Sequence, residues 1–167
     1  MMPYPPLGTL YAASYLREKG FSVAFHDVML TRSENEITES IRRHRPQLVV
    51  IYDDQFNYLT KMCLRRMREA AFAMTQIAKQ AGCAVCIFSS DASDHVQEYF
   101  ANGADYVLCG EAEETLAELC QNIFRKGSKD ISHIHGLAYL ENGQIVRTFK
   151  RPVLETVRCQ DFPGPVF

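Results

Sequence analysis

The sequence predicts an α/β domain in which a doubly wound, mostly parallel β-sheet is covered by helices on both faces. Short apolar runs alternate with helix-length amphipathic segments through most of the chain, which is the pattern of right-handed β-α-β crossovers. The clearest run, Leu48 to Tyr52, is apolar throughout and rich in β-branched residues, as in strands buried on both faces. Near the C-terminus, Asn142-Gly143 lies between two apolar segments and indicates an antiparallel hairpin.

Composition fits one globular domain. The chain has 167 residues, of which 47% are hydrophobic and 23% are charged, enough for one continuous core. A formal net charge of −2 gives no electrostatic basis for binding nucleic acid. No apolar stretch approaches the roughly 20 residues of a membrane-spanning helix, and the N-terminus lacks the basic and apolar regions of an export signal. We therefore expect a cytoplasmic protein without membrane or nucleic-acid partners.

The first half of the chain carries a local signal for each expected element. Pro5-Pro6 fits the first turn of a helix, which Gly20 ends. Ser33 and Glu36 have the spacing of a capping box and start a second helix, which Arg45-Pro46 ends. The expected order is a helix over 7–19, a strand over 21–27, a helix with Ile37 and Ile41 on one face, a strand over 48–52 and a long helix to about Lys79.

The long helix carries an apolar stripe at three-to-four spacing that includes Leu59, Cys63 and Met67. Its three arginines, Arg65, Arg66 and Arg68, fall outside the stripe. Charges opposite an apolar stripe are typical of a solvated surface, so we interpret them that way rather than as a phosphate site.

The second half continues the alternation and then changes to a hairpin. We expect a strand over 83–88, a polar loop, a helix over 95–102, a strand over 106–109, a helix over 113–126 and hairpin strands over 137–140 and 145–148. The tail over 158–167, with Pro163-Gly164-Pro165, has the composition of a linker. The expected organisation is an α/β unit over 1–130, a hairpin extension over 131–157 and this linker.

No strand precedes the first expected helix. A parallel sheet of this kind normally begins with a strand, yet the chain enters a helix directly after Pro3 to Pro6. Either the sheet has one strand fewer, or a first strand lies upstream or comes from another chain. An unpaired sheet edge invites pairing with a second chain, so a homodimer is one expectation.

Polar loops follow three neighbouring strands, at the carboxyl ends where open parallel sheets bind ligands. These loops supply the candidate binding residues. They are Asp53, Asp54, Gln55 and Asn57 after the first buried strand, Ser89, Ser90, Asp91, Ala92 and His95 after the second, and Gly110, Glu111 and Glu113 after the third.

Several of these residues also have ordinary structural interpretations. Glu111 and Glu113 stand where a helix macrodipole favours carboxylates, and Asp91 and Asp94 can cap the helix after His95. A phosphoacceptor role for Asp53-Asp54 is disfavoured, because the accompanying acids and lysine are not evident.

Familiar motifs for other chemistry are absent from the sequence. There is no GxGxxG after the first expected strand, no Walker lysine and no GxSxG elbow, which disfavours simple dehydrogenases, ATPases and hydrolases. Six cysteines are present, and we expect reduced thiols. Cys83 and Cys86 form a CxxC, but within a strand they face opposite sides and are poorly placed to share a metal.

Several motifs, in the right order, resemble the cobalamin-binding domain that precedes the catalytic barrel in cobalamin-dependent radical SAM enzymes. This group includes the anaerobic magnesium-protoporphyrin monomethyl ester cyclases and many methyltransferases. The matching segments are Pro5-Pro6-Leu7-Gly8-Thr9-Leu10-Tyr11-Ala12-Ala13 with Leu16-Arg17-Glu18-Lys19-Gly20, Pro46 to Ile51, Gly103 to Val107, Gly110 to Leu116, and Ile134 to Tyr139.

The resemblance implies a Rossmann-like or flavodoxin-like sheet with cobalamin seated across the strand ends. Leu7 and Gly8 would then join the loop residues named above in lining the corrin, with Gln55 or Asp54 nearest the lower face of cobalt. The protein would supply orientation and electrostatics for methyl carriage or electron tuning at cobalt. The 4Fe-4S cluster and S-adenosylmethionine would belong only to the radical SAM domain, the expected partner of this one.

The chain departs from that family in two ways: it has no CxxxCxxC cluster motif and no strand before Pro5-Pro6. It also lacks the DxHxxG motif by which other cobalamin domains supply an axial histidine. Radical SAM relatives generally lack that motif too, so the resemblance implies a corrin bound without a protein imidazole. Three hypotheses follow: a cobalamin-binding module without catalysis of its own, a non-binding domain that serves dimerisation or assembly, and a flavodoxin-like or receiver-like domain that binds flavin or a phosphoryl group.

Overall fold

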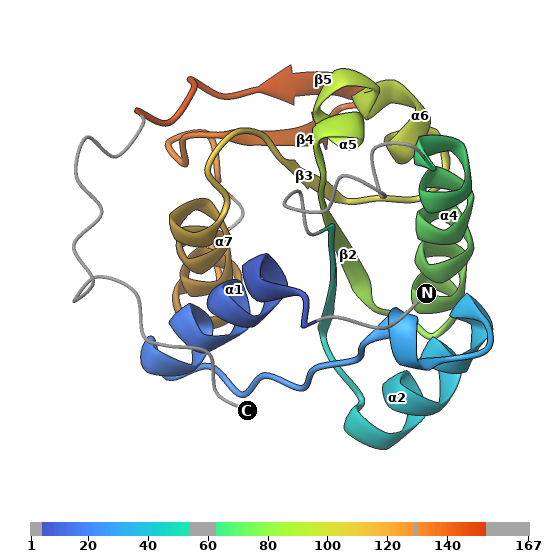
Figure 1. Ribbon diagram of the computed structural model, residues 1–167. Helices are drawn as coiled ribbons and strands as arrows, with labels where there is room; N and C mark the ends of the chain where they lie inside the picture. The colour runs from blue at the N-terminus through green and yellow to red at the C-terminus, as the bar shows by residue number, and fades with distance from the viewer. Residues whose placement is uncertain (1–4, 54–62, 129, 153–167) are drawn as a thin grey trace.

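The computed structural model describes residues 5–53, 63–128 and 130–152, and these form one sheet with helices on both faces (Figure 1). The strands are β1 (Leu48–Tyr52), β2 (Ala84–Phe88), β3 (Tyr106–Leu108), β4 (Leu137–Glu141) and β5 (Gln144–Arg147). The α-helices are α1 (Leu7–Glu18), α2 (Ile37–His44), α4 (Leu64–Gln80), α5 (Ser90–Asp94), α6 (Val96–Ala101) and α7 (Glu113–Cys120). The predicted α/β, Rossmann-like fold class is confirmed. Within the described ranges, no helix has the length and hydropathy needed to cross a bilayer.

The sheet has the order β1-β2-β3-β4-β5. β1, β2 and β3 are parallel, and their registers align Tyr52 with Phe88 and Phe88 with Leu108, so that the three strands end at the same level. β4 and β5 form the predicted hairpin and extend the sheet with antiparallel pairing. Asn142 and Gly143 both have positive φ, of 51° and 78°, as a two-residue type I′ turn requires.

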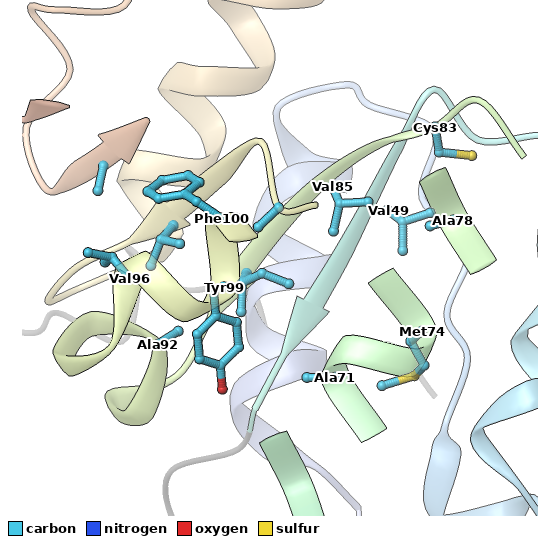
Figure 2. Close-up of a cluster of buried hydrophobic side chains, with 14 of the residues drawn as sticks. Val49, Ala71, Met74, Ala78, Cys83, Val85, Ala92, Val96, Tyr99 and Phe100 are labelled. Carbon is cyan, nitrogen blue, oxygen red and sulfur yellow. The ribbon is translucent and has the colours of Figure 1, made fainter. Parts of the chain in front are cut away.

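Two apolar clusters hold the helices against the sheet. On one face, Val49 and Val85 of the strands pack with Met74 of α4 and with Tyr99 and Phe100 of α6 (Figure 2). On the other face, α1 and α7 pack through residues that include Leu16, Leu116 and Leu119. Cys83, directly before β2, belongs to the first cluster and Cys86 to the second, so the two thiols lie on opposite faces of the sheet, as the strand pattern predicted.

The strand expected over 21–27 is wrong. These residues form an extended connection between α1 and α2 (Figure 1), and they pair with no described strand. The sequence pattern is strand-like, but a strand needs a neighbour to accept its backbone hydrogen bonds, and no described strand lies beside this segment.

The helix expected after Ser33 begins as a 3₁₀ turn over Glu34–Glu36 and continues as α2. The Ser33 hydroxyl accepts a hydrogen bond from the backbone N–H of Asn35 at 3.2 Å. The Glu36 carboxylate reaches back to the N–H of Arg32 at 2.8 Å, one residue before the capping position. Ile37 and Ile41 face the core as predicted.

The last expected helix, over 113–126, is confirmed in extent but not in regular geometry. It begins as α7 and continues as a π-helical segment over Gln121–Lys126. Arg125, in that segment, donates to the carbonyl oxygen of Lys19 at the end of α1 at 2.6 Å. This contact ties the two helices on that face together at the end farther from the loops.

Candidate functional site

The carboxyl ends of β1, β2 and β3 bring the predicted loops to one edge of the sheet. The backbone N–H of Asp53 donates to the carbonyl oxygen of Phe88 at 2.9 Å, extending the β1–β2 pairing by one residue. The rings of Tyr52 and Phe88 lie with centroids 4.4 Å apart. The turns that contain Asp53, Ser89 and Glu111 are therefore neighbours, which a broad binding surface at this edge requires.

Tyr52 connects three elements at this edge. Its hydroxyl donates to the Glu113 carboxylate at the start of α7, at 2.7 Å. Its carbonyl oxygen accepts from the Thr9 hydroxyl in the first turn of α1, at 3.3 Å. Glu113, a predicted binding residue, is thus oriented by a tyrosine that the sequence analysis did not single out.

Replacing Tyr52 with phenylalanine is expected to lower the free energy of unfolding by about 1 kcal/mol, because the Glu113 carboxylate loses a hydrogen-bond donor. Urea unfolding measures the change. Tyr139→Phe is the control, since the Tyr139 ring is buried but its hydroxyl has no hydrogen-bond partner among the described residues. Equal losses in the two variants would contradict this role for Tyr52.

The polar run after β2, expected as a loop, is the short helix α5. The Ser89 hydroxyl caps it by accepting from the N–H of Ala92 at 2.9 Å. The Ser93 hydroxyl donates to the carbonyl oxygens of Ser89 and Leu108, at 3.1 and 3.3 Å. A serine at the N-cap position favours the start of a helix, and the bond from Ser93 to Leu108 connects this turn with the end of β3.

Asp91 accepts an unusually complete set of hydrogen bonds. Arg68 of α4 donates to both of its carboxylate oxygens, at 2.7 and 2.6 Å, and the Tyr99 hydroxyl donates at 2.8 Å. The Asp91 side chain is 8% exposed. The Arg68 guanidinium and the Tyr99 hydroxyl hold the pKa of the Asp91 carboxyl below its usual value, although burial acts in the opposite direction. Both oxygens are engaged within the protein.

The interpretation of Asp91 and Asp94 as caps of the helix after His95 is wrong. His95 itself occupies the N-cap position of α6, and no side chain caps that end. The Asp91 side chain is instead drawn to Arg68, because a bidentate pair with a guanidinium is stronger than a neutral cap.

The interpretation of Arg68 as part of a solvated face is also wrong, whereas it holds for Arg65. The Arg65 side chain is 94% exposed, and that of Arg68 is 25% exposed. Arg66 pairs with Glu34 across the surface at 2.7 Å. Arg68 lies four residues before Phe72, whose ring packs edge-on against Tyr99. The sequence offered no signal for this difference, because the partners Asp91 and Glu98 lie more than 20 residues away.

Small residues stand at the carboxyl ends of β2 and β3 and at the start of α1 in the described ranges. Gly110 follows β3 and is exposed, and a Cβ built on it would meet no atom within 4 Å. Ala92 is buried under the α5 turn and Ser90 is exposed on it. At the start of α1, Gly8 is buried and Leu7 is 46% exposed. Apart from Leu7, these positions carry small side chains or none.

His95 lies apart from these groups. It sits at the junction of α5 and α6, where it lines a cavity of about 530 Å³ with Ile145 and Arg147 of the hairpin. Its ring nitrogens lie 3.8 Å from Asp91 and 3.5 Å from Glu98. Asp54, Gln55 and Asn57 lie outside the described residues. No group of three or more metal-ligating His, Cys, Asp or Glu side chains occurs in the described part of the chain.

Solved structures of two radical enzymes share this fold. The cobalamin-dependent S-adenosylmethionine radical enzyme OxsB, with aqua-cobalamin and S-adenosylmethionine bound, matches with a TM-score of 0.67 and 18% identity, over 91% of this chain and 20% of OxsB. The radical S-adenosylmethionine methyltransferase TsrM from Kitasatospora setae, with tryptophan and a SAM analogue bound, matches with a TM-score of 0.66 and 19% identity, over 88% of this chain and 28% of TsrM. At these identities the likeness establishes the fold.

The sequence comparisons give a more specific result. None of the curated protein sequences with which the chain was compared matches it. The family profile described as the B12 binding domain matches residues 2–120, a range that runs from the segment before α1 to the end of α7 and includes all three loops at the carboxyl edge. The chain therefore belongs to the B12-binding domain family.

Proposed function

We propose that this chain binds cobalamin and seats the corrin ring against the carboxyl edge of β1, β2 and β3. The observation that carries the proposal is the position of three turns. The turns after the three parallel strands lie together at the carboxyl edge, within the range that matches the family profile. Leu7, Gly8, Ser90 and Gly110 would line the ring with small or apolar groups. Asp53 and Glu111 would accept hydrogen bonds from the ring's amides.

Two of the candidate residues, Asp91 and Glu113, already accept hydrogen bonds within the protein. They would contribute to cobalamin binding indirectly. Asp91 would hold α5 in place through Arg68, and Glu113 would hold the β1 and α7 ends together through Tyr52. Asp54, Gln55 and Asn57 remain proposed contacts of the same surface. His95, at the junction of α5 and α6 beside the hairpin, remains the least direct of the proposed contacts.

Cobalamin, when bound, would supply methyl carriage or electron transfer at cobalt, and the protein would orient it. We place this chain as the cobalamin-binding module of a radical SAM enzyme of the methyltransferase or cyclase type. The iron-sulfur cluster and S-adenosylmethionine would then be held by a separate domain. A cytoplasmic location fits that chemistry and stays a proposal.

The direct test is to mix the purified protein with hydroxocobalamin, separate it by gel filtration and record its visible spectrum. We expect cobalamin to co-elute with a shifted spectrum, and flavin mononucleotide, run in parallel, to separate from the protein. Absence of retained cobalamin under both oxidising and reducing conditions, or retention of the flavin instead, would overturn the proposal.

Replacing Ser90 with tryptophan is expected to weaken cobalamin binding at least roughly tenfold, because a large side chain on the exposed start of α5 would occupy space needed by the ring. Equilibrium titration monitored by absorbance measures the change. Gln80→Trp is the matched control. Gln80 is also exposed but ends α4 at the opposite edge of the sheet, so this variant should bind as the parent does. Equal affinity of both variants would place the ligand elsewhere.

A further inference from the structure

The five residues after β5 stay attached to the domain. Residues 148–152, called the strap below, follow the last residue of β5. The backbone N–H of Thr148 donates to the carbonyl oxygen of Leu137 at 2.9 Å, and the carbonyl oxygen of Phe149 accepts from the N–H of Gly136 at 2.7 Å. The strap therefore continues the pairing of the hairpin and lies beside Gly136.

The side chain of Arg151 fastens the strap to α7. Its Nε donates to the Thr115 hydroxyl at 2.9 Å, and its terminal nitrogens donate to the carboxylates of Glu114, at 3.0 Å, and Glu118. The Arg151 side chain is only 11% exposed. A guanidinium so covered needs acceptors in place of water, and α7 supplies three of them from consecutive turns.

Thr115 connects Arg151 with the turn that follows β3. Its side chain is fully buried. The hydroxyl that accepts from Arg151 also lies 2.9 Å from the carbonyl oxygen of His135 and 3.3 Å from that of Glu111. Because Glu111 belongs to the turn over 110–113, the strap reaches the far end of that turn through a single side chain.

A second connection runs through the backbone and reaches the near end of the same turn. The N–H of Cys109 donates to the carbonyl oxygen of Gly136 at 2.7 Å, and Gly136 donates in turn to Phe149 of the strap. Cys109 directly precedes Gly110. The strap thus contacts the turn over 110–113 from both ends, although more than 30 residues separate them in sequence.

The turn over 110–113 needs such support, because its own residues restrict it little. Gly110 has φ of +89°, and a Cβ built there would meet no atom within 4 Å. Glycine loses more conformational entropy than any other residue when it becomes ordered. A ligand that had to order this turn would lose affinity, and contacts that order it beforehand remove that cost.

We propose that Arg151 is a positioning residue for cobalamin binding, which holds the turn over 110–113 in its binding conformation through Thr115. The inference rests on the proposed function, since Gly110 and Glu111 of this turn are proposed contacts of the corrin. It adds a part that the family match does not contain. The matched range ends at residue 120, and the strap lies beyond it.

The test replaces Arg151 with methionine and first measures amide hydrogen exchange without cobalamin. Two amides report on the connection: that of Leu116, which donates to Ala112 at the start of α7, and that of Gly136, which donates to the strap. We expect both to exchange at least roughly tenfold faster, because local opening becomes easier. The amide of Ala92, held by Ser89 in the neighbouring turn, should change less.

The second measurement is cobalamin affinity, by equilibrium titration with hydroxocobalamin. We expect Arg151→Met to bind at least roughly fivefold more weakly than the parent, because the turn must then be ordered on binding. Arg125→Met is the matched control. Arg125 also joins the α7 side of the molecule to another segment, through the carbonyl oxygen of Lys19, but away from the turn. Its affinity should stay within about twofold of the parent.

A double-mutant cycle with Thr115→Val separates positioning from a general loss of stability. If Arg151 acts through the Thr115 hydroxyl, the two changes weaken cobalamin binding together by less than the product of their separate effects. If Arg151→Met does not fold, Arg151→Lys takes its place, because it keeps the charge but cannot reach three acceptors at once.

Three results would overturn the proposal. One is exchange of Leu116 and Gly136 no faster in the Arg151 variant than in Arg125→Met. Another is faster exchange with unchanged cobalamin affinity, and the third is strictly multiplicative effects in the cycle. A parent chain that binds no cobalamin would instead remove the proposed function, and with it the binding role of Arg151, while the exchange rates would still show whether Arg151 holds the turn.

Discussion

Replacing Arg68 with methionine is expected to lower the free energy of unfolding by about 3 kcal/mol, because the Asp91 carboxylate is left buried without its bidentate partner. The pair spans α4 and α5, with Asp91 8% exposed and Arg68 25% exposed. Methionine keeps the length and apolar stem of the side chain, so the loss reports the charge and its hydrogen bonds. Urea unfolding followed by circular dichroism measures it.

Arg65→Met is the control on the same helix. Arg65 makes an exposed i,i+4 pair with Glu69 at 3.0 Å, and such pairs contribute about 0.3–0.5 kcal/mol. A loss at Arg68 no larger than that at Arg65 would show that the Asp91 pair contributes nothing beyond an ordinary surface contact.

The effect of Arg68→Met should depend on pH in a defined direction. The Arg68 guanidinium lowers the pKa of Asp91 in the folded protein. A carboxyl with a lowered folded pKa stabilises the protein above its unfolded pKa and loses that contribution as the pH falls through the folded value. The difference between parent and variant is therefore full at neutral pH and shrinks below about pH 4. A difference that grows on acidification would refute this cause.

Replacing Gly136 with alanine is expected to destabilise the protein by roughly 2–4 kcal/mol, from a strained backbone and a steric clash together. Gly136 has φ of +75°, and a Cβ would lie 2.9 Å from the carbonyl oxygen of Cys109 and 3.1 Å from the Thr115 hydroxyl. The backbone cannot easily move away, because Gly136 accepts from Cys109 and donates to Phe149, both at 2.7 Å.

Gly143→Ala separates the two causes. Gly143 has a similar φ of +78°, but no atom lies within 4 Å of a Cβ built there. Only the left-handed backbone penalty of about 1–2 kcal/mol applies. Thermal unfolding of both variants gives the comparison, and equal losses would mean that strand β4 shifts to accommodate the methyl group at position 136.

Much of the fold could be predicted because its signals are local. The apolar run of β1, the proline-led start of α1 and the Asn142-Gly143 turn each specify an element within a few residues. The same locality placed the three polar turns at one edge, since parallel strands share the direction of their carboxyl ends. The resemblance to the cobalamin-binding domain is likewise local, because it rests on short contiguous motifs such as those that contain Leu7-Gly8 and Gly110-Glu111.

The features that sequence reasoning missed depend on partners far along the chain. Arg65 and Arg68 look alike in sequence, and only the packing of α5 against α4 makes one a surface charge and the other the counter-ion of Asp91. Segment 21–27 has a strand's pattern and is not paired, because backbone hydrogen bonds need a neighbour and side-chain alternation does not supply one. The sequence by itself determined the fold class, the family and most of the elements, with the strand over 21–27 as the main exception. Only the tertiary structure decided which charged side chains form ion pairs and which strand-like segments are paired. Burial and pairing depend on elements that meet only after the chain has folded.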